Sequence, residues 1–246
     1  MRIAACSLLL IVACDGGADG DFPVNPGGGS GTSGSGSGTP DARPGDGGAT
    51  VTGRVCGVSE ILVWDDCDVT GLDGAMVTIG TAAATAVDDG TFEIPTPTGS
   101  DLVWRVTGAG RVKSLREFSA DYEIQSITTA LYEDITANAN VAVGSGLGTI
   151  FAEVVSMQLP VSGATATLAG QLELVRYDDV NASGGFGVDE THASGIIWIP
   201  NVTPGANVTF RVTPPAAVGA PKDVTVPIEA DTATFVTVEF TAPPAQ

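Results

Sequence analysis

Short β-branched runs separated by turn-forming residues limit the folds open to this chain more than any other feature of its sequence. Glycine, proline and aspartate interrupt the runs at about the 8–12-residue spacing typical of β-sandwiches. The runs include ATVTGRV from Ala49, AMVTIG from Ala75, GTFEIP from Gly90 and DLVWRVTG from Asp101. The pattern therefore predicts an all-β fold built from β-sandwiches.

The chain also has a segment with helical rather than strand periodicity. Its apolar positions Ile127, Leu131, Ile135 and Ala139 lie four residues apart, and the pattern stops at Gly144. Apolar residues at this spacing form one face of an amphipathic helix, and glycine is a common stop signal. We therefore expect a short helical connector that packs against a sandwich.

The second half of the chain repeats the first. The matching segments occur in the same order, and repetition of this kind indicates a duplicated structural unit. TGRV from Thr52 matches LGTI from Leu147, GAMVTIG from Gly74 matches GATATLA from Gly163, and GTFEIPTPTGSDLVWRVT from Gly90 matches GIIWIPNVTPGANVTFRVT from Gly195. The repeat predicts two tandem sandwiches, at residues 49–122 and 147–242, joined by the helical connector at 123–146.

The order of these motifs resembles the carboxypeptidase regulatory-like domain. The resemblance covers nearly all of the first copy and most of the second, and it implies a seven-stranded transthyretin-like or Ig-like sandwich. The second copy departs from it, because Ala193 and Ser194 replace the Asp-Gly turn of the first copy. The matching turn and core positions are Gly53, Gly74, Ala75, Gly90, Phe92 and Ile94.

The apolar run from Ile3 to Ala13 follows a single positive charge at Arg2. It is too short to cross a membrane, since a transmembrane helix needs about 20 residues. The run therefore predicts a signal peptide over residues 1–13.

The end of this run resembles the lipobox of bacterial lipoproteins, with Ile11, Val12 and Ala13 before Cys14. The resemblance implies cleavage before Cys14, a diacylglyceryl group on its thiol and acylation of its amine. Such chains hold a protein firmly on a bilayer, because each buried methylene contributes about 0.8 kcal/mol. We therefore expect a lipid-anchored protein of the bacterial cell envelope that faces the periplasm or the cell exterior. A soluble secreted protein with an unmodified Cys14 is the alternative.

Residues 14–48 contain almost nothing apolar and are rich in glycine, serine, proline and aspartate. This composition predicts a disordered tether that holds the folded part away from the membrane. A hydrophobic fraction of 43% predicts a folded core for the remainder. The net charge of -19 excludes nucleic acid as a partner, because phosphate binding requires lysine and arginine.

Cys56 and Cys67 are the only cysteines after Cys14. In an oxidising compartment such a pair predicts a disulfide, which stabilises a fold by roughly 3 kcal/mol in the chain-entropy model. A metal site is the alternative, but it lacks further ligands because His192 is the single histidine.

The stretch DVNASGGFGVDE follows the spacing of an EF-hand calcium loop. Asp179, Asn181, Ser183 and Glu190 stand at ligand positions 1, 3, 5 and 12, and Gly184 stands at the turn position 6. The flanking segments QLELVRY and ASGIIWIP have strand patterns, whereas an EF-hand loop lies between helices. Two interpretations remain open, a Ca²⁺ site and a polar turn between strands.

The sequence offers little for catalysis. A single histidine, His192, excludes a zinc site of the H-E-x-x-H type, and the chain has no G-x-S-x-G nucleophile elbow. We therefore predict that the protein is not an enzyme and that it needs no cofactor unless the calcium loop is occupied. Trp64, Trp104 and Trp198 would offer a carbohydrate platform if their rings were exposed, which alternation alone does not decide.

These observations favour a non-enzymatic, membrane-anchored envelope lipoprotein that displays tandem β-sandwiches for structural or adhesive interaction. Its expected partners are the membrane, through the lipid anchor, and a protein or glycan ligand at the cell surface. The alternative function is a calcium- or carbohydrate-binding surface module.

Overall fold

Strands make up most of the part of the chain that the computed structural model describes, which comprises residues 49–63, 72–99, 102–117, 123–169, 174–182 and 185–241. The predicted signal peptide and tether therefore lie outside the described residues. So do Cys14, Trp64, Cys67, Ser183 and Gly184. No helix within the described ranges is long and apolar enough to cross a membrane.

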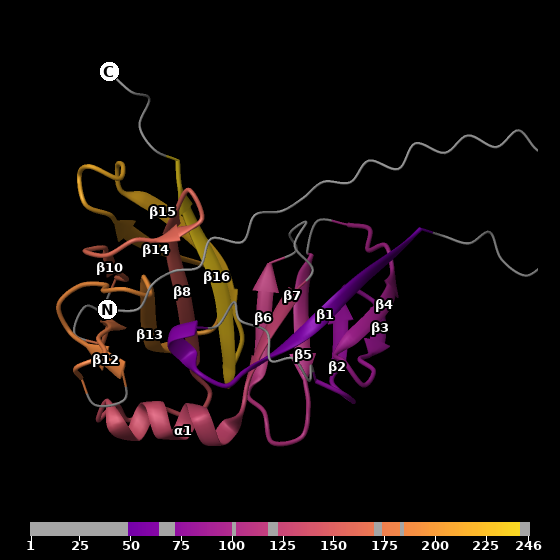
Figure 1. The fold of residues 1–246 in the computed structure, drawn as a ribbon. Helices are drawn as coiled ribbons and strands as arrows, with labels where there is room; N and C mark the ends of the chain where they lie inside the picture. The colour runs from indigo at the N-terminus through magenta and orange to yellow at the C-terminus, as the bar shows by residue number, and fades with distance from the viewer. Residues whose placement is uncertain are drawn as a thin grey trace, which may run out of the picture. The chain divides into compact units, whose positions relative to one another are not determined.

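The first half of the described chain is a sandwich of two sheets (Figure 1). Strands β4, β1 and β7 form one sheet, and β3, β2, β5 and β6 form the facing layer. Buried side chains such as Val55, Ile94 and Trp104 fill the space between them. The elements are β1 (Thr50–Val58), η1 (Ile61–Val63), β2 (Met76–Ile79), β3 (Ala82–Thr85), β4 (Thr91–Pro95), β5 (Val103–Thr107), β6 (Lys113–Glu117) and β7 (Glu123–Ile127).

The expected helix is α1 (Thr129–Asn138), which follows β7 directly. The side chain of Thr128 caps its first turn, because Thr128 Oγ1 accepts a 3.0 Å hydrogen bond from the main-chain nitrogen of Leu131. Leu131 and Ile135 face the protein, and Ile135 is buried. Ile127, which shares their spacing, ends β7 instead of belonging to the helix.

The second half is another sandwich. Strands β12, β11, β13, β8 and β16 form one layer, and β10, β14 and β15 form the other. The elements are β8 (Gly148–Ser156), β9 (Leu159–Pro160), β10 (Thr165–Thr167), β11 (Arg176–Asp178), β12 (Phe186–Gly187), β13 (Ile196–Val202), β14 (Gly205–Thr213), β15 (Lys222–Ile228) and β16 (Thr232–Phe240). The predicted all-β fold class of two tandem sandwiches with a helical connector is thus confirmed.

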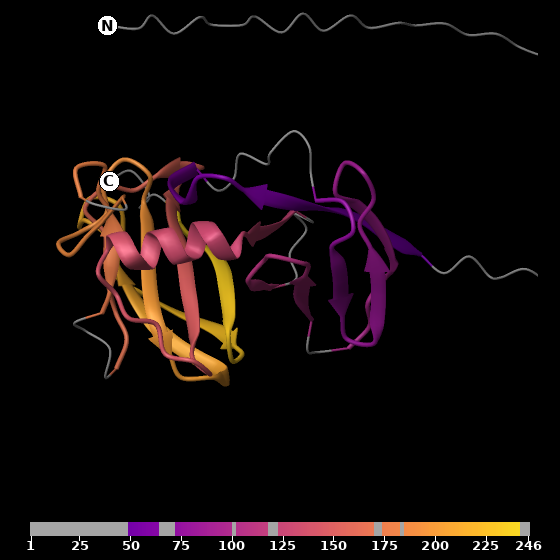
Figure 2. The same ribbon diagram turned by 90° about the horizontal axis from the view of Figure 1, so that it is seen from below.

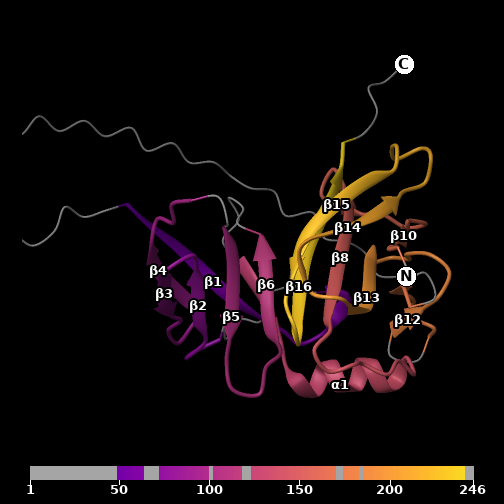
Figure 3. The same ribbon diagram turned by 180° about the vertical axis from the view of Figure 1, so that it is seen from behind.

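The two sandwiches share one continuous sheet. The last strand, β16, pairs in parallel with β6 of the first sandwich, from Thr232 opposite Lys113 to Phe235 opposite Arg116. The large sheet therefore runs from β12 through β8, β16 and β6 to β3, with β9 paired to β8 (Figure 3). Main-chain hydrogen bonds, and not only the connector, hold the two halves together. Nothing in the sequence predicted this joint.

The two small sheets cover opposite faces of the large sheet. Arg116 pairs with Phe235 across the joint and with Trp104 in β5, so these three side chains share one face. Trp104 belongs to the first core, beneath β4, β1 and β7. Val236 points to the opposite face, because neighbouring strand residues alternate, and it packs on the second core, which includes residues of β10, β14 and β15.

The helix α1 covers the face of the second sandwich that the small sheet leaves open (Figure 2). Ile135 packs there with Phe151, Trp198 and Phe235 in a third buried cluster. Burial of each such side chain contributes about 1.5–3 kcal/mol. Strand β8 is consequently covered on both faces, and its residues are buried almost throughout.

Strand pairing is repeated between the halves as the internal repeat suggests. Met76 pairs with Thr107 between β2 and β5, and the matching residues Thr165 and Thr213 pair between β10 and β14. Each half also ends with a strand that pairs in parallel with its first strand, β7 with β1 and β16 with β8.

One repeat motif is displaced by four residues. Val51 pairs with Ile94 in the first half, and Ile150 pairs with the matching Ile199 in the second. The sequence match instead aligns Ile150 with Val55. A shift by an even number of residues keeps every side chain on the same face of the sheet. The observed pairing and the pairing that the sequence match implies would therefore bury the same alternate residues of the strand.

Candidate functional site

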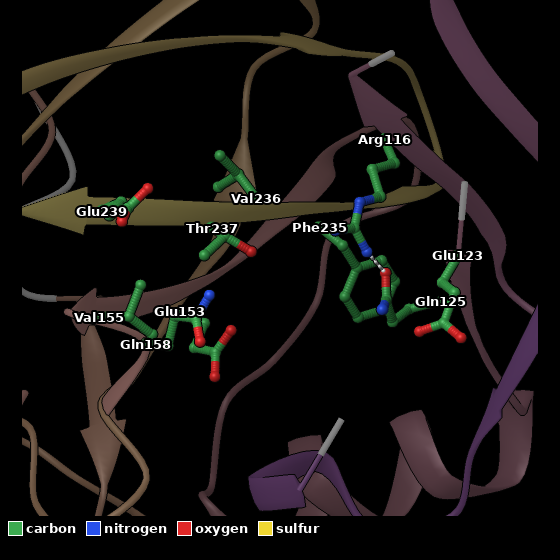
Figure 4. A pocket seen from close by; sticks show the side chains of 10 residues that line it. All are labelled: Arg116, Glu123, Gln125, Glu153, Val155, Gln158, Phe235, Val236, Thr237 and Glu239. Atoms are coloured by element: carbon green, nitrogen blue, oxygen red, sulfur yellow. Dashed lines mark hydrogen bonds between the residues drawn. The ribbon is translucent and has the colours of Figure 1, made fainter. Parts of the chain in front are cut away.

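A cavity of about 460 Å³ lies beside the joint between the sandwiches. We call it the junction pocket. It opens on the same sheet face as Phe151 and Phe235, beyond the part that α1 covers, and Figure 4 shows the side chains that line it. Its lining residues are Arg116 from β6, Glu123 and Gln125 from β7, Glu153 and Val155 from β8, Gln158 from the turn after β8, and Phe235, Val236, Thr237 and Glu239 from β16.

The floor of the junction pocket comes from the adjacent parallel strands β8 and β16. Glu153 pairs with Thr237, and Val155 pairs with Glu239. Glu153 and Glu239 are therefore diagonal neighbours on one face, at the end of the buried row that contains Phe235. The strands β6 and β7 supply the wall through Arg116 and through Glu123 and Gln125. Glu123 and Gln125 lie two residues apart in β7 and so point to the same side of the strand.

Arg116 is fixed to this wall. Its Nη1 donates a hydrogen bond to Oε1 of Gln125, which links β6 to β7 (Figure 4). Since Arg116 also stands opposite Phe235 across the joint, the wall and the floor are connected through it.

The charges of the junction pocket are unequal. Three glutamates, at positions 123, 153 and 239, face one arginine at position 116. The residue Glu153 is only 8% exposed, and a carboxylate at that depth is weakly screened by water. Within the described ranges, no group of three acidic, cysteine or histidine side chains converges closely enough to hold a metal ion.

An aromatic row ends at the pocket. The rings of Trp198 and Phe151 stack with centroids 6.1 Å apart, and those of Phe151 and Phe235 stack at 5.5 Å. The indole nitrogen of Trp198 donates a 2.8 Å hydrogen bond to Oγ1 of Thr149. The row fixes Phe235, and with it the inner end of the pocket floor.

Both tryptophans within the described ranges are core residues. Trp104 and Trp198 are fully buried, and Trp104 packs edge-on against Phe92 with centroids 5.5 Å apart. They do not form an exposed platform for sugars, so that hypothesis is wrong for these two rings. Trp64 lies outside the described residues.

The candidate calcium loop connects β11 to β12, which pair as a hairpin with Asp178 opposite Phe186. Oδ1 of Asp179 accepts hydrogen bonds of 2.9 and 3.2 Å from the main-chain and side-chain nitrogens of Asn181. Glu190 follows β12, and its carboxylate lies near Gly163. The described residues on either side of Ser183 and Gly184 thus form local hydrogen bonds, and the Ca²⁺ site with Asp179, Asn181, Ser183 and Glu190 stays a prediction.

The turn that sequence reasoning found anomalous in the second copy is organised by Asp178. This carboxylate is 1% exposed, and it accepts hydrogen bonds of 2.8, 2.7 and 3.1 Å from the main-chain nitrogens of His192, Ser194 and Ile196. Asp178 therefore takes over the role of the missing Asp-Gly turn. His192 itself is exposed and contributes its main chain to this network.

Cys56 is buried in β1, at 1% exposure. Its expected disulfide partner, Cys67, lies outside the described residues, so the Cys56–Cys67 bond stays a prediction.

Sequence reasoning missed the junction pocket, although one signal for it was present. Strand β8 reads GTIFAEVVS, and Glu153 is the one charged residue in this nearly continuous apolar run. Strands buried on both faces carry few charges, so a carboxylate at this point indicates a polar cavity or a partner.

Comparison with protein-family models and with curated proteins gives no match. Solved structures that resemble the chain include shaft pilin SpaA from Lactobacillus rhamnosus GG, at 9% identity and a TM-score of 0.24. A single-site mutant of that pilin has 11% identity and a TM-score of 0.26, and a double mutant has 11% and 0.25. Each comparison covers 80% of this chain and 98% of the pilin chain. At these values the likeness carries no argument about function, and the family resemblances drawn from sequence stay predictions.

Proposed function

We propose that this protein is a non-enzymatic envelope lipoprotein that displays its two sandwiches as one rigid structural or adhesive unit. The observation that carries the proposal is the parallel pairing of β16 with β6, which turns two sandwiches into one sheet. Domains joined only by a linker move relative to each other by default. A shared sheet instead transmits force through main-chain hydrogen bonds, as a stalk or an adhesive surface requires.

Ion pairs between the two sandwiches reinforce this joint. Glu229, in the turn between β15 and β16, forms ion pairs with Arg105 on β5 and Lys113 on β6. Both sandwiches thus contribute to one partly exposed ion-pair network, which together with the shared sheet opposes rotation about the connector. A rigid pair of sandwiches suits a protein that presents a binding or structural surface to a partner.

Anchoring of the unit rests on the lipobox resemblance at Cys14 and on the predicted tether at 14–48. On the basis of 5–6 Å times the square root of the residue number, the tether has a span of roughly 30 Å. This distance would place the sandwiches beyond the lipid headgroups, where a partner on another surface is within reach.

Mass spectrometry of the full-length chain from a bacterial host tests the anchor. We expect the membrane fraction to contain a chain that begins at an acylated Cys14. The variant Cys14→Ser should leave the membrane fraction, whereas Cys6→Ser, which alters a cysteine inside the predicted signal peptide, should stay there. An unacylated chain that retains Met1 and fractionates with the cytosol would contradict the proposal.

A further inference from the structure

We propose that two copies of this protein associate through β3, which pairs antiparallel with β3 of the second copy. Strand β3 (Ala82–Thr85) is the outermost strand of the large sheet in the first sandwich, and it pairs with β2 alone (Figures 1 and 3). This inference goes beyond the proposed display role and does not depend on the lipid anchor.

The open side of β3 presents main-chain hydrogen-bonding groups. The nitrogen of Ala86 donates a 2.8 Å hydrogen bond to the carbonyl oxygen of Ala75, so Ala86 bonds toward β2. Residues of an antiparallel pair alternate between bonding to the partner strand and pointing away from it. The N–H and C=O groups of Ala83 and Thr85 therefore point away from β2, and both residues are exposed. Within the described part of the chain, these four groups have no partner.

The other outer strands of the described sheets have closed or interrupted edges. In β10, the hydroxyl of Tyr177 bonds both main-chain groups of Ala166 at 3.0 and 3.2 Å, and Thr191 bonds those of Ala164 at 2.8 and 2.9 Å. Strands β9 and β12 have only two residues each. The remaining edges carry charged residues or proline, namely Glu93 and Pro95 in β4, Glu123 in β7, and Lys222, Asp223 and Pro227 in β15. Such features prevent pairing between sheet edges, so β3 is the edge that is available for pairing.

A second copy can bond all four open groups through a two-fold axis. With the axis at Ala84, Ala83 of each copy stands opposite Thr85 of the other, and each of these two pairs exchanges two hydrogen bonds. Ala84 then faces Ala84 of the second copy in a close pair, with Cα atoms about 4.5 Å apart. A methyl side chain fits this approach. Two-fold symmetry is also the commonest arrangement of homo-oligomers.

The charge distribution favours self-pairing at this edge. In a two-fold contact each charged residue approaches its own copy, so a charged edge repels itself. A net charge of -19 opposes most approaches between two copies. Residues 80–87, in contrast, carry no charge, and the flanking Asp88 and Asp89 would lie at opposite ends of the antiparallel joint. The open edge of β3 is thus a place where two acidic copies can meet.

The association should be weak and should depend on salt. A contact through one four-residue strand per copy belongs to the low end of interface sizes, below about 1,200 Å², where complexes are transient. Added salt should strengthen the association, because it screens the repulsion between the acidic copies. Copies anchored on one membrane would also meet at a higher effective concentration.

Cysteine cross-linking of the full-length chain tests the register. In a chain whose Cys6 and Cys14 are replaced by serine, Ala84→Cys should form a covalent dimer on mild oxidation, because the two Cα atoms lie within the range of about 4.4–6.8 Å that a disulfide spans. The matched control is Ala82→Cys, which lies on the same face of β3. In the proposed register its Cα atom is roughly 13 Å or more from that of its own copy. We expect at least about tenfold less covalent dimer for this control on non-reducing electrophoresis.

Sedimentation velocity measures the pairing without a cross-link. We expect a monomer–dimer equilibrium that shifts toward the dimer with protein concentration and with added salt. Ala83→Pro should lower the association constant about tenfold or more, because proline removes an N–H that points across the joint and makes no bond within one copy. Ala83→Thr keeps this N–H and should leave the association constant within about twofold.

Four results would overturn the proposal. Equal cross-linking of Ala84→Cys and Ala82→Cys would contradict the register. Equal losses for Ala83→Pro and Ala83→Thr would remove the main-chain argument, and a dimer that Ala83→Pro leaves intact would place the contact elsewhere. A chain that stays monomeric at high concentration and high salt would leave β3 for a strand of another protein. The cross-linking test does not require Ala83→Pro to fold, and none of these measurements involves acylation of Cys14.

Discussion

Arg105 donates a 2.6 Å hydrogen bond from Nε to Oε1 of Glu229, and this contact joins β5 of the first sandwich to the turn between β15 and β16 of the second. Lys113 on β6 binds the other carboxylate oxygen. One carboxylate thus links its own turn to β5 and β6, two strands that precede it by more than one hundred residues in the sequence. The joint between the sandwiches therefore depends on ionisation as well as on strand pairing.

Replacement of Glu229 by glutamine should weaken this joint. The side chain is 30% exposed, so we expect the modest loss of a partly solvated ion-pair network, about 1 kcal/mol. For a folded part of this size that corresponds to a fall of roughly 2–4 °C in melting temperature at neutral pH. Thermal unfolding of the wild type and of Glu229→Gln measures it, with Glu133→Gln on the exposed side of α1 as control.

The effect of Glu229→Gln should depend on pH. Burial raises the pKa of the Glu229 carboxyl, but hydrogen bonds and charges from Lys113 and Arg105 lower it more, so its folded-state pKa lies below the usual value. A depressed pKa contributes stability above the unfolded-state pKa, about 4.3 for glutamate, and the contribution is lost as the pH falls through the folded-state pKa. The difference between wild type and variant should therefore be full at pH 7 and should shrink below about pH 4. A constant difference across this range would show that Glu229 acts by packing alone.

Asp178 should be among the least replaceable polar residues of the second sandwich. Its buried carboxylate accepts three main-chain hydrogen bonds, so Asp178→Ala would leave buried donors without acceptors. We expect a loss of about 2–4 kcal/mol in the free energy of unfolding, measured by urea denaturation. The exposed Asp189 provides the control, since Asp189→Ala should change stability by less than about 0.5 kcal/mol. Similar losses for both variants would contradict the role assigned to Asp178.

Local features of the fold were readable from the sequence because they depend on neighbouring residues. The strand runs and the helix near Ile135 follow from short-range patterns. The internal repeat predicted a duplicated unit, and the matching pairs of Met76 with Thr107 and of Thr165 with Thr213 agree with it. The parallel joint of Thr232 with Lys113 follows from no such pattern, because partner choice at such separation is decided by how the packed layers fit.

Burial was also hard to predict where both faces of a strand are covered. Val103 and Trp104 are adjacent in β5, and both are buried, so alternation gives no indication of which side is inside. The junction pocket was invisible for a related reason. It combines side chains from β6, β7, β8 and β16, and no local pattern brings Glu123 together with Glu239.

Two glycines with the same backbone conformation should differ sharply in their tolerance of alanine. Gly195 and Gly110 have φ angles of 66° and 68°. A Cβ atom at Gly195 would lie 2.6 Å from the carbonyl oxygen of Val154, whereas at Gly110 it would meet nothing within 4 Å. Gly110→Ala should lose about 1 kcal/mol from the left-handed backbone alone, and Gly195→Ala roughly 2–4 kcal/mol, because the clash with β8 is added. Equal losses in urea denaturation would contradict the close approach at Gly195.

Removal of the predicted disulfide should destabilise the first sandwich. The double variant Cys56→Ser, Cys67→Ser is expected to lose roughly 3 kcal/mol in the chain-entropy model. Reduction of the wild type with dithiothreitol should give the same fall in melting temperature, and the reductant should not affect the double variant. A wild-type melting temperature that does not respond to reductant would rule out the bond.

Calcium should raise the melting temperature if the segment from Asp179 to Glu190 is a Ca²⁺ site. Ligands that bind only the folded state stabilise it by RT ln(1 + [L]/Kd), about 2.7 kcal/mol at one hundred times Kd. In the structure, Oδ1 of Asp179 instead accepts from Asn181, so calcium binding would have to replace this local hydrogen bond. We expect a rise at millimolar Ca²⁺ that disappears in Asp179→Ala and in Glu190→Gln and persists in the control Asp88→Ala, which alters an acidic turn of the first sandwich. A rise of equal size in Asp179→Ala would assign the effect to the overall negative charge of the protein. No rise in melting temperature at millimolar Ca²⁺ would leave the segment as a polar turn between β11 and β12.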